Sequence, residues 1–302
     1  MNDNIKFKGV FIPIITIFKE NEEVNYDGIK NHVEYLINAG VNGIISGAAT
    51  SEFFHLSVEE RKNIAETIVK QVNRRIPVVI GTAANATKES IELSKHAEYI
   101  GADGVMINPP SYWHINEDEI CLHYGMIGKK VSLPIIVYND PSVSYTNISP
   151  KLLLRMKNVC SNIKYVKDSS NSINNIQDIL LNKTNLDVDV FVGEEPICLY
   201  ALYVGCVGII SLIANGIPEF SIEMVNLFYR NAFIEARQLH YKFLPLMNYL
   251  FFNDNKYSCI SIVKSILKLR NRNVGITRMP MMSLPQKEEE KLYRLLKDRE
   301  II

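Results

Sequence analysis

The chain has 302 residues, of which 47% are hydrophobic and 22% charged, a composition typical of one large or two ordinary globular domains. Its 33 basic and 33 acidic side chains cancel, so charge gives no basis for a nucleic acid or an anionic membrane as partner. No apolar run approaches the roughly 20 residues that span a bilayer, and the N-terminal residues lack the pattern of a secretory signal. The five cysteines are odd in number and never spaced as C-x-x-C, so we expect reduced core residues of a cytoplasmic protein.

Eight short β-branched runs recur along the chain, with helical patterns between them. Strands are predicted at residues 10–19, 41–46, 76–81, 104–108, 134–139, 163–168, 189–194 and 207–211. One of the helical patterns begins with a cap at Asn25 and ends at Gly40, and in the next Ser57 and Glu60 have capping-box spacing. Eight strands alternating with helices predict an α/β protein with a parallel, closed (β/α)8 TIM barrel, since an open doubly wound sheet has fewer strands.

The C-terminal part of the chain is poor in strand patterns and rich in helical ones. A TIM barrel needs about 250 residues, so a remainder is expected. We predict a catalytic barrel over residues 1–219, with its last helix continuing to about residue 231. Residues 220–302 are predicted as an appended helical region without a flexible linker before it.

Several reactive side chains follow predicted strands at their carboxyl ends. Lys167 closes the sixth strand, Tyr138 closes the fifth, Glu194 and Glu195 end or follow the seventh, and residues 46–52 follow the second. Active sites of TIM barrels lie at this end of the strands. We therefore expect these side chains to converge on one face.

A lysine in an apolar barrel mouth can act as a nucleophile. Burial penalises the ammonium form, and a neutral amine can attack a ketone to form an imine that withdraws electrons. A tyrosine beside it can move protons. The alternative, given equal weight, is that Lys167 is a strand-end lysine pointing at water and Tyr138 an ordinary core residue.

Other motifs are weaker. The loop SGAATSE at 46–52 can offer backbone N–H groups to a carboxylate or phosphate, although for such a loop taken alone an ordinary tight turn is the better explanation. The Tyr112-Trp113 pair follows the fourth strand and is either a hydrophobic lid or a substrate or subunit contact. The six histidines are scattered without ligand spacing, so no metal site and no cofactor is predicted.

Taken in order, these motifs resemble the N-acetylneuraminate lyase and dihydrodipicolinate synthase superfamily of pyruvate-dependent, Schiff-base-forming class I aldolases. The resemblance rests on VKDSS, YNDP, AATSE, PPSYW and the late segment GCVGIIS, and it covers nearly the whole chain. It implies a carbon–carbon or carbon–oxygen lyase that acts on a small 2-keto acid, and a homotetramer built as a dimer of dimers. The site residues that it implies are Lys167 for the imine, Tyr138 for proton transfer, Tyr112 reaching a neighbouring subunit's site, and Ala49, Thr50, Ser51, Glu194, Glu195 and Ile210 for substrate binding.

Three residues depart from the superfamily pattern. Ala49 stands where many members have the hydroxyl that links two tyrosines, and Ser51 replaces a loop glycine, which matters if that position needs a positive φ. Val143 stands where dihydrodipicolinate synthases have an arginine that grips the carboxylate of aspartate semialdehyde.

These departures favour a hydroxylated substrate of the sugar-acid type, such as a 2-keto-3-deoxy acid or N-acetylneuraminate. Glu194 and Glu195 would hold its hydroxyl groups, unless they only favour a helix N-terminus. The second hypothesis is 4-hydroxy-tetrahydrodipicolinate synthase, which Val143 disfavours. The third is a catalytically silent barrel that binds a ligand.

Overall fold

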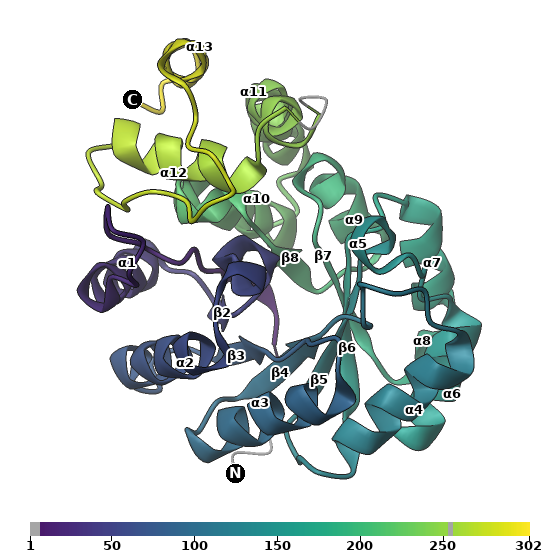
Figure 1. Ribbon diagram of the computed structural model, residues 1–302. Helices are drawn as coiled ribbons and strands as arrows, with labels where there is room; N and C mark the ends of the chain where they lie inside the picture. Colours follow the sequence, from purple (N-terminus) through teal and green to yellow (C-terminus); the bar gives the residue numbers. More distant parts are fainter. Residues whose placement is uncertain (1–6, 253–255) are drawn as a thin grey trace.

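The computed structural model describes residues 7–252 and 256–302. Residues 1–6 and 253–255, which fall within the two predicted regions, lie outside the described residues. Eight parallel strands close into a barrel in chain order, with β8 pairing back to β1, which confirms the predicted fold (Figure 1). The strands are β1 (Gly9–Pro13), β2 (Gly43–Ser46), β3 (Val78–Gly81), β4 (Gly104–Ile107), β5 (Ile135–Asn139), β6 (Ile163–Asp168), β7 (Asp189–Val192) and β8 (Gly208–Ile210).

The first strand is much shorter than the range 10–19 predicted for it. It ends at Pro13, and the backbone N–H of Ile15 donates to the side-chain oxygen of Asn215 at 3.1 Å instead of to a neighbouring strand. Residues 14–18 are nevertheless buried. Their apolar character therefore reflects packing outside the sheet, which a period-two pattern cannot distinguish from a strand.

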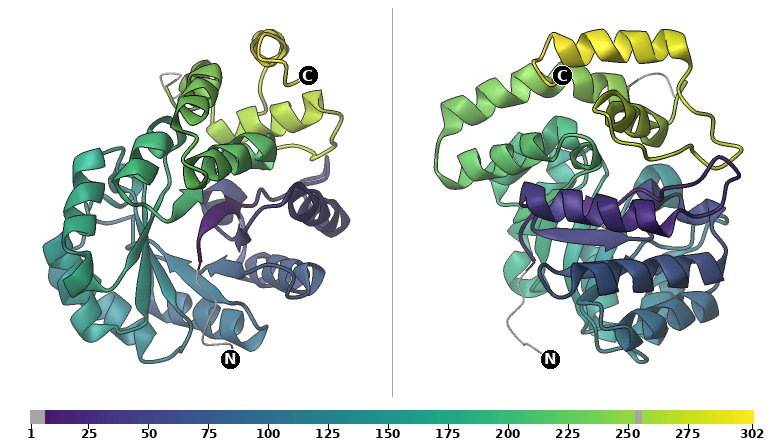
Figure 2. Two further views of the ribbon diagram at one scale, coloured as in Figure 1. Left: turned by 180° about the vertical axis from the view of Figure 1, so that it is seen from behind. Right: turned by 90° about the vertical axis from the view of Figure 1, so that its left-hand side faces the viewer.

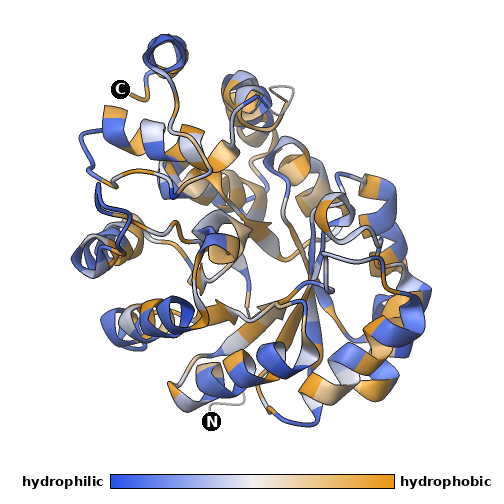
Figure 3. Cartoon of the chain, viewed as in Figure 1, coloured by the Kyte–Doolittle hydropathy of each residue, from blue (hydrophilic) through white to orange (hydrophobic). Residues whose placement is uncertain are grey.

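Helices surround the barrel and turn their hydrophilic faces outward (Figure 3). The larger ones that follow the strands are α1 (Tyr26–Ala39), α2 (Val58–Val72), α3 (Thr87–Tyr99), α4 (Glu117–Gly128), α6 (Pro150–Val159), α7 (Ile173–Leu181), α9 (Cys198–Val204) and α10 (Pro218–Tyr229). Two single turns, α5 (Pro141–Ser144) and α8 (Lys183–Leu186), were not predicted. The predicted helix signals are confirmed, because Gly40 ends α1 with φ 91° and Ser57 and Glu60 form the capping box of α2.

The C-terminal helices lie together against one side of the barrel (Figure 2). They are α11 (Phe233–Phe251), α12 (Cys259–Leu269) and α13 (Gln286–Lys297). The predicted boundary at 219/220 falls inside α10, and the division into a barrel and a helical region stays a prediction. Among the described helices, none is both long and apolar enough to cross a bilayer.

The barrel interior forms its own small core, separate from the layer between strands and helices. Tyr165 belongs to the interior cluster, and the next residue, Val166, belongs to the outer layer. Successive side chains of a strand alternate between its two faces, so Lys167 follows Tyr165 into the interior. The phenol of Tyr165 also accepts a hydrogen bond from the backbone N–H of Phe7 at 3.1 Å, near the opposite end of the barrel. Lys167 is thus carried by a strand whose inward face is otherwise aromatic.

Candidate active site

Lys167 and Tyr138 are neighbours across the pairing of β5 and β6. The Lys167 Nζ atom lies 3.8 Å from the centroid of the Tyr138 ring, and the lysine is only 5% exposed. Lys167 therefore faces the barrel interior and does not point at open water. Burial lowers the pKa of its amine, and the nearby carboxylates of Asp140, Glu194 and Glu195 oppose that shift. Burial therefore shifts the Lys167 amine towards its neutral form, and the carboxylates compensate the charge of the ammonium form when it is present.

The Tyr138 phenol is paired with a carboxylate that the sequence did not single out. Its O–H donates to Asp140 Oδ2 at 2.8 Å. Burial, followed by the charge of Asp140, raises the pKa of Tyr138 well above its ordinary value, so the phenol keeps its proton. The available signal was the YNDP motif itself, where an aspartate before Pro141 predicts the cap of a helical turn.

A close approach of backbone to side chains narrows the space around Lys167. Gly193 directly follows β7, and a Cβ atom placed there would come within 2.6 Å of Lys167 Cε and closer still to Ser169 Oγ. The Ser169 hydroxyl is buried and makes no hydrogen bond to any described residue. It lies near the side chains of Tyr138 and Glu194. Only glycine fits at residue 193 without moving the lysine.

The predicted carboxylate-binding loop forms a single 3-10 turn, η1 (Ala49–Ser51), after β2. Its last residue is already engaged, because Ser51 Oγ donates to the Ile14 carbonyl at 2.6 Å and accepts from the Ala48 N–H at 3.2 Å. The Ser51 N–H donates to the Ala48 carbonyl. The left-handed backbone falls at Glu52, with φ 55°, so the serine that replaces the family's glycine causes no strain of this kind.

The two glutamates after β7 have different surroundings. Glu195 is fully buried, and its Oε1 accepts hydrogen bonds from Ser211 Oγ at 3.0 Å and from the Ile213 N–H at 2.9 Å. It therefore holds the turn that follows β8, while its Oε2 has no hydrogen bond within the described residues. Glu194 is half-buried; burial, followed by the charge of Glu195, raises its pKa to about 8. Glu194 is thus neutral or charged near physiological pH according to small changes around it.

The remaining predicted residues lie at different depths. Ile210 is buried inside the barrel, in the same cluster as Tyr138. Thr50 is 9% exposed. Tyr112 is 85% exposed and lies outside this group, because the backbone N–H groups of residues 111 and 112 are tied to Asn85 Oδ1. Within a single chain, the site therefore lacks Tyr112.

Comparisons with known proteins show the family of the chain. A sequence model of the dihydrodipicolinate synthetase family matches residues 6–299. The chain belongs to this family. It is 35% identical to the 4-hydroxy-tetrahydrodipicolinate synthase of Methanocaldococcus jannaschii, over 98% of this chain and 100% of the relative.

Solved structures of the dihydrodipicolinate synthetase family have the same fold. A dihydrodipicolinate synthase crystal structure superposes with a TM-score of 0.90 at 34% identity, covering 98% of this chain and 100% of the other. YagE, an Escherichia coli K12 prophage protein solved with pyruvate, gives 0.92 at 27% identity, over 99% and 100% of the two chains. The protein is therefore an enzyme, a class I lyase of the lysine-imine type. The names of the relatives favour the second hypothesis, 4-hydroxy-tetrahydrodipicolinate synthase, over the sugar-acid hypothesis.

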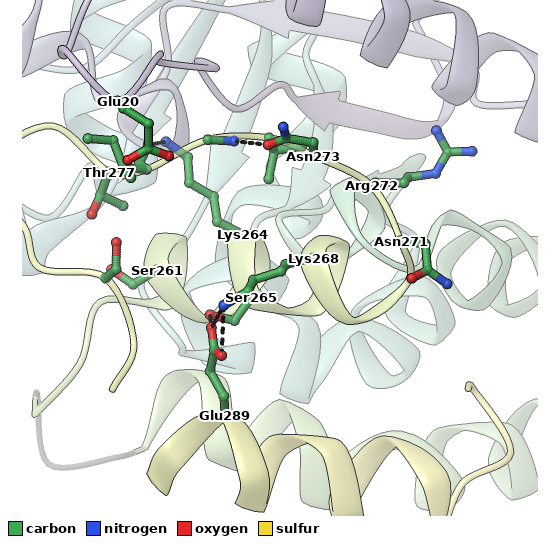
Figure 4. Close-up of a pocket in the computed structure, with 14 residues that line it drawn as sticks. Glu20, Ser261, Lys264, Ser265, Lys268, Asn271, Arg272, Asn273, Thr277 and Glu289 are labelled. Atoms are coloured by element: carbon green, nitrogen blue, oxygen red, sulfur yellow. Dashed lines mark hydrogen bonds and ion pairs between the residues drawn. The ribbon is translucent and has the colours of Figure 1, made fainter. Parts of the chain in front are cut away.

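The described parts of the chain contain no group of three or more His, Cys, Asp or Glu residues arranged for a metal ion. A cavity of about 450 Å³ lies away from Lys167, between α12 and the segment 271–277 (Figure 4). Lys264 projects from α12 along its wall. This cavity belongs to the C-terminal helices and not to the mouth of the barrel.

Proposed function

We propose that the protein joins pyruvate to an aldehyde, or cleaves the product, through an imine on Lys167. The Lys167 amine attacks the keto carbon of pyruvate, and loss of water forms the imine. The methyl carbon then gives up a proton, and the resulting enamine attacks the aldehyde carbon. The new alkoxide takes up a proton, and water releases the 4-hydroxy-2-keto acid from the restored amine. The observation that carries this proposal is the buried Nζ lying 3.8 Å from the Tyr138 ring centroid.

The other site residues would serve this reaction as follows. The Tyr138 phenol, which keeps its proton, would act as general acid and base at the aldol hydroxyl. Thr50 and the backbone of Ala49 would hold the pyruvate carboxylate, and Ser51 would shape their turn through its bonds to Ala48 and Ile14. Ile210 would line the floor of the site. Tyr112, exposed in one chain, would complete the site of a neighbouring subunit in a homotetramer.

Two aldehydes are supported by different observations. The names of the relatives support aspartate semialdehyde, and thus 4-hydroxy-tetrahydrodipicolinate synthase. The acidic groups beside Lys167 support a hydroxylated, uncharged aldehyde, because Asp140 would repel a carboxylate and Glu194, with its pKa raised to about 8, offers it no cation. Val143, which is 45% exposed on α5, supplies no cation to counter that repulsion. For Glu195 we propose a supporting role, since its carboxylate is engaged with the turn after β8.

We further propose a reducing compartment such as the cytoplasm. All five cysteines are free thiols, and four of them are buried. Burial raises the pKa of Cys198, Cys206 and Cys259, which keeps these thiols protonated and unreactive.

Trapping the imine tests the proposal. Incubation with pyruvate and borohydride should leave a carboxyethyl group on Lys167, found by mass spectrometry of the digested protein. Lys167→Ala should abolish the adduct. The control Lys164→Ala, at an exposed lysine of the same strand, should leave it intact. Absence of any adduct in the wild-type protein would refute the imine on Lys167.

The aldehyde is identified in a second assay. Pyruvate would be offered with aspartate semialdehyde in one reaction and with a series of hydroxylated aldehydes in another. If pyruvate is consumed rapidly with aspartate semialdehyde but not with the hydroxylated aldehydes, the protein is a 4-hydroxy-tetrahydrodipicolinate synthase. Consumption only with hydroxylated aldehydes would establish the sugar-acid type of substrate.

A further inference from the structure

Tyr138 needs a partner that can exchange its proton. A phenol whose pKa is raised well above its ordinary value is a poor base by itself. The loop residue Ala49 has no hydroxyl to offer. The hydrogen bond from the Tyr138 O–H to Asp140 Oδ2, 2.8 Å long, provides a carboxylate in the required place.

The fold holds Asp140 in this position by using its other oxygen. Asp140 Oδ1 accepts hydrogen bonds from the Ser142 N–H at 3.2 Å and from Ser142 Oγ at 2.6 Å, as the N-cap of α5. The Asp140 carbonyl accepts a third bond, from Ser144 Oγ at 2.9 Å. The side chain therefore cannot rotate without breaking its cap, and Oδ2 stays directed at Tyr138. Asp140 is only half-buried, which leaves its carboxylate near the open end of the barrel.

We propose that Asp140 and Tyr138 form a proton relay for the imine on Lys167. When the methyl group of the bound pyruvate loses a proton, the Tyr138 oxygen takes it up and the phenol proton passes to Asp140 Oδ2. In the reverse sense, Asp140 returns its proton to Tyr138 as Tyr138 protonates the new alkoxide. The number of protons balances over one turnover, and no further reactant is needed. Asp140 acts through Tyr138 and is a positioning residue that does not touch the substrate; the relay rests on the proposed imine.

Proton exchange at the methyl group of pyruvate tests the relay without knowledge of the aldehyde. In D2O the wild-type protein should replace the pyruvate methyl protons by deuterium, followed by NMR. Asp140→Asn keeps the cap through Oδ1 but presents an NH2 group that cannot accept the phenol proton. The maximal exchange rate should fall about 100-fold, the low end of general acid–base effects, while the pyruvate concentration for half-maximal exchange stays unchanged. The control Lys164→Ala, at the exposed lysine of β6, should exchange at the wild-type rate.

Combination with Tyr138→Phe separates a relay from a structural role. Tyr138→Phe should slow exchange to a similar extent, and adding Asp140→Asn to it should cause little further loss, because the two residues act in series. Multiplied losses in the double variant, or an unchanged rate in Asp140→Asn, would overturn the relay. Absence of both exchange and a borohydride adduct in the wild-type protein would instead refute the proposed imine.

Discussion

The position of the Lys167 side chain depends on the absence of a Cβ atom at Gly193. Gly193 places only a hydrogen where any other residue would put a carbon against Lys167 Cε and Ser169 Oγ. The backbone of residue 193 does not need a left-handed conformation. The requirement for glycine is therefore one of space at the active lysine, and it can be tested apart from backbone strain.

Gly193→Ala should impair imine formation more than folding. The added methyl group must displace Lys167 or Ser169, and a displacement of about 1 Å at a reacting group can cost on the order of 100-fold in rate. We expect borohydride trapping to slow 10- to 100-fold, with a loss of about 1–3 kcal/mol in the free energy of unfolding. Gly101→Ala is the matched control, since residue 101 has φ 82° but no atom within 4 Å of the added carbon. It should cost about 1 kcal/mol of stability and leave trapping unchanged; equal trapping rates in both variants would contradict this account.

The C-terminal helices are joined to the substrate-binding loop by one buried ion pair. Glu52, directly after η1, is fully buried and accepts hydrogen bonds from Lys264 Nζ at 2.7 Å and from the Arg278 N–H at 3.0 Å. Lys264 lies on α12, faces the cavity of Figure 4, and donates a second bond to the Ile276 carbonyl at 2.7 Å. The turn expected to bind the pyruvate carboxylate is therefore held from behind by α12 and the segment that follows it.

Lys264→Met should destabilise the protein strongly because it leaves the Glu52 carboxylate buried without its cation. Breaking one side of a buried ion pair costs about 3–5 kcal/mol, which urea unfolding would measure. Lys268→Met, one turn further along α12, removes an exposed pair with Glu289 and should cost less than about 1 kcal/mol. Adding Glu52→Gln to Lys264→Met should recover part of the loss. Equal losses in the free energy of unfolding for Lys264→Met and Lys268→Met would show that the buried ion pair does not stabilise the contact between α12 and the turn η1.

At the scale of the whole molecule, the sequence predicts the barrel and the strand pairings, because these depend on the order of the elements along the chain and on the alternation of side chains in strands. Eight alternating units define the barrel, and barrel closure then brings the ends of β5 and β6 together, so the pairing of Tyr138 with Lys167 follows. The contact between Glu52 and Lys264 joins residues 212 positions apart, and it depends on how α12 docks, which no local pattern encodes. The bond from Tyr138 to Asp140 spans two residues but depends on side-chain rotation, which a motif does not report. A lysine within the apolar SIVKSIL was a readable signal, of the same kind as Lys167.

Stability towards acid depends on buried histidines in different parts of the outer ring. His32 on α1 and His123 on α4 are buried, and burial lowers the pKa of each to about 4. Their pKa values in the unfolded chain are higher, so the unfolded state binds more protons between pH 6.5 and 4 and is favoured there. The raised pKa of Glu194 acts with the opposite sign over part of this range, because the folded state then binds the extra proton. The histidine contribution must therefore be measured as a difference between variants.

We expect each histidine to remove about 2 kcal/mol from the free energy of unfolding between pH 7 and pH 5. Urea unfolding of the wild-type protein and of His32→Gln with His123→Gln, at both pH values and one protein concentration, measures this. The variant loses the hydrogen bond from His32 Nε2 to Asn215 Oδ1 and the one between His123 Nδ1 and Thr87 Oγ1 at either pH, so its absolute stability should be lower throughout. Its stability should nevertheless fall by about 4 kcal/mol less than that of the wild type on acidification, because neither glutamine takes up a proton. If the stability of the two proteins falls equally on acidification, both histidines take up protons in the folded protein as readily as in the unfolded chain. Water would then reach the layer between the barrel and its helices.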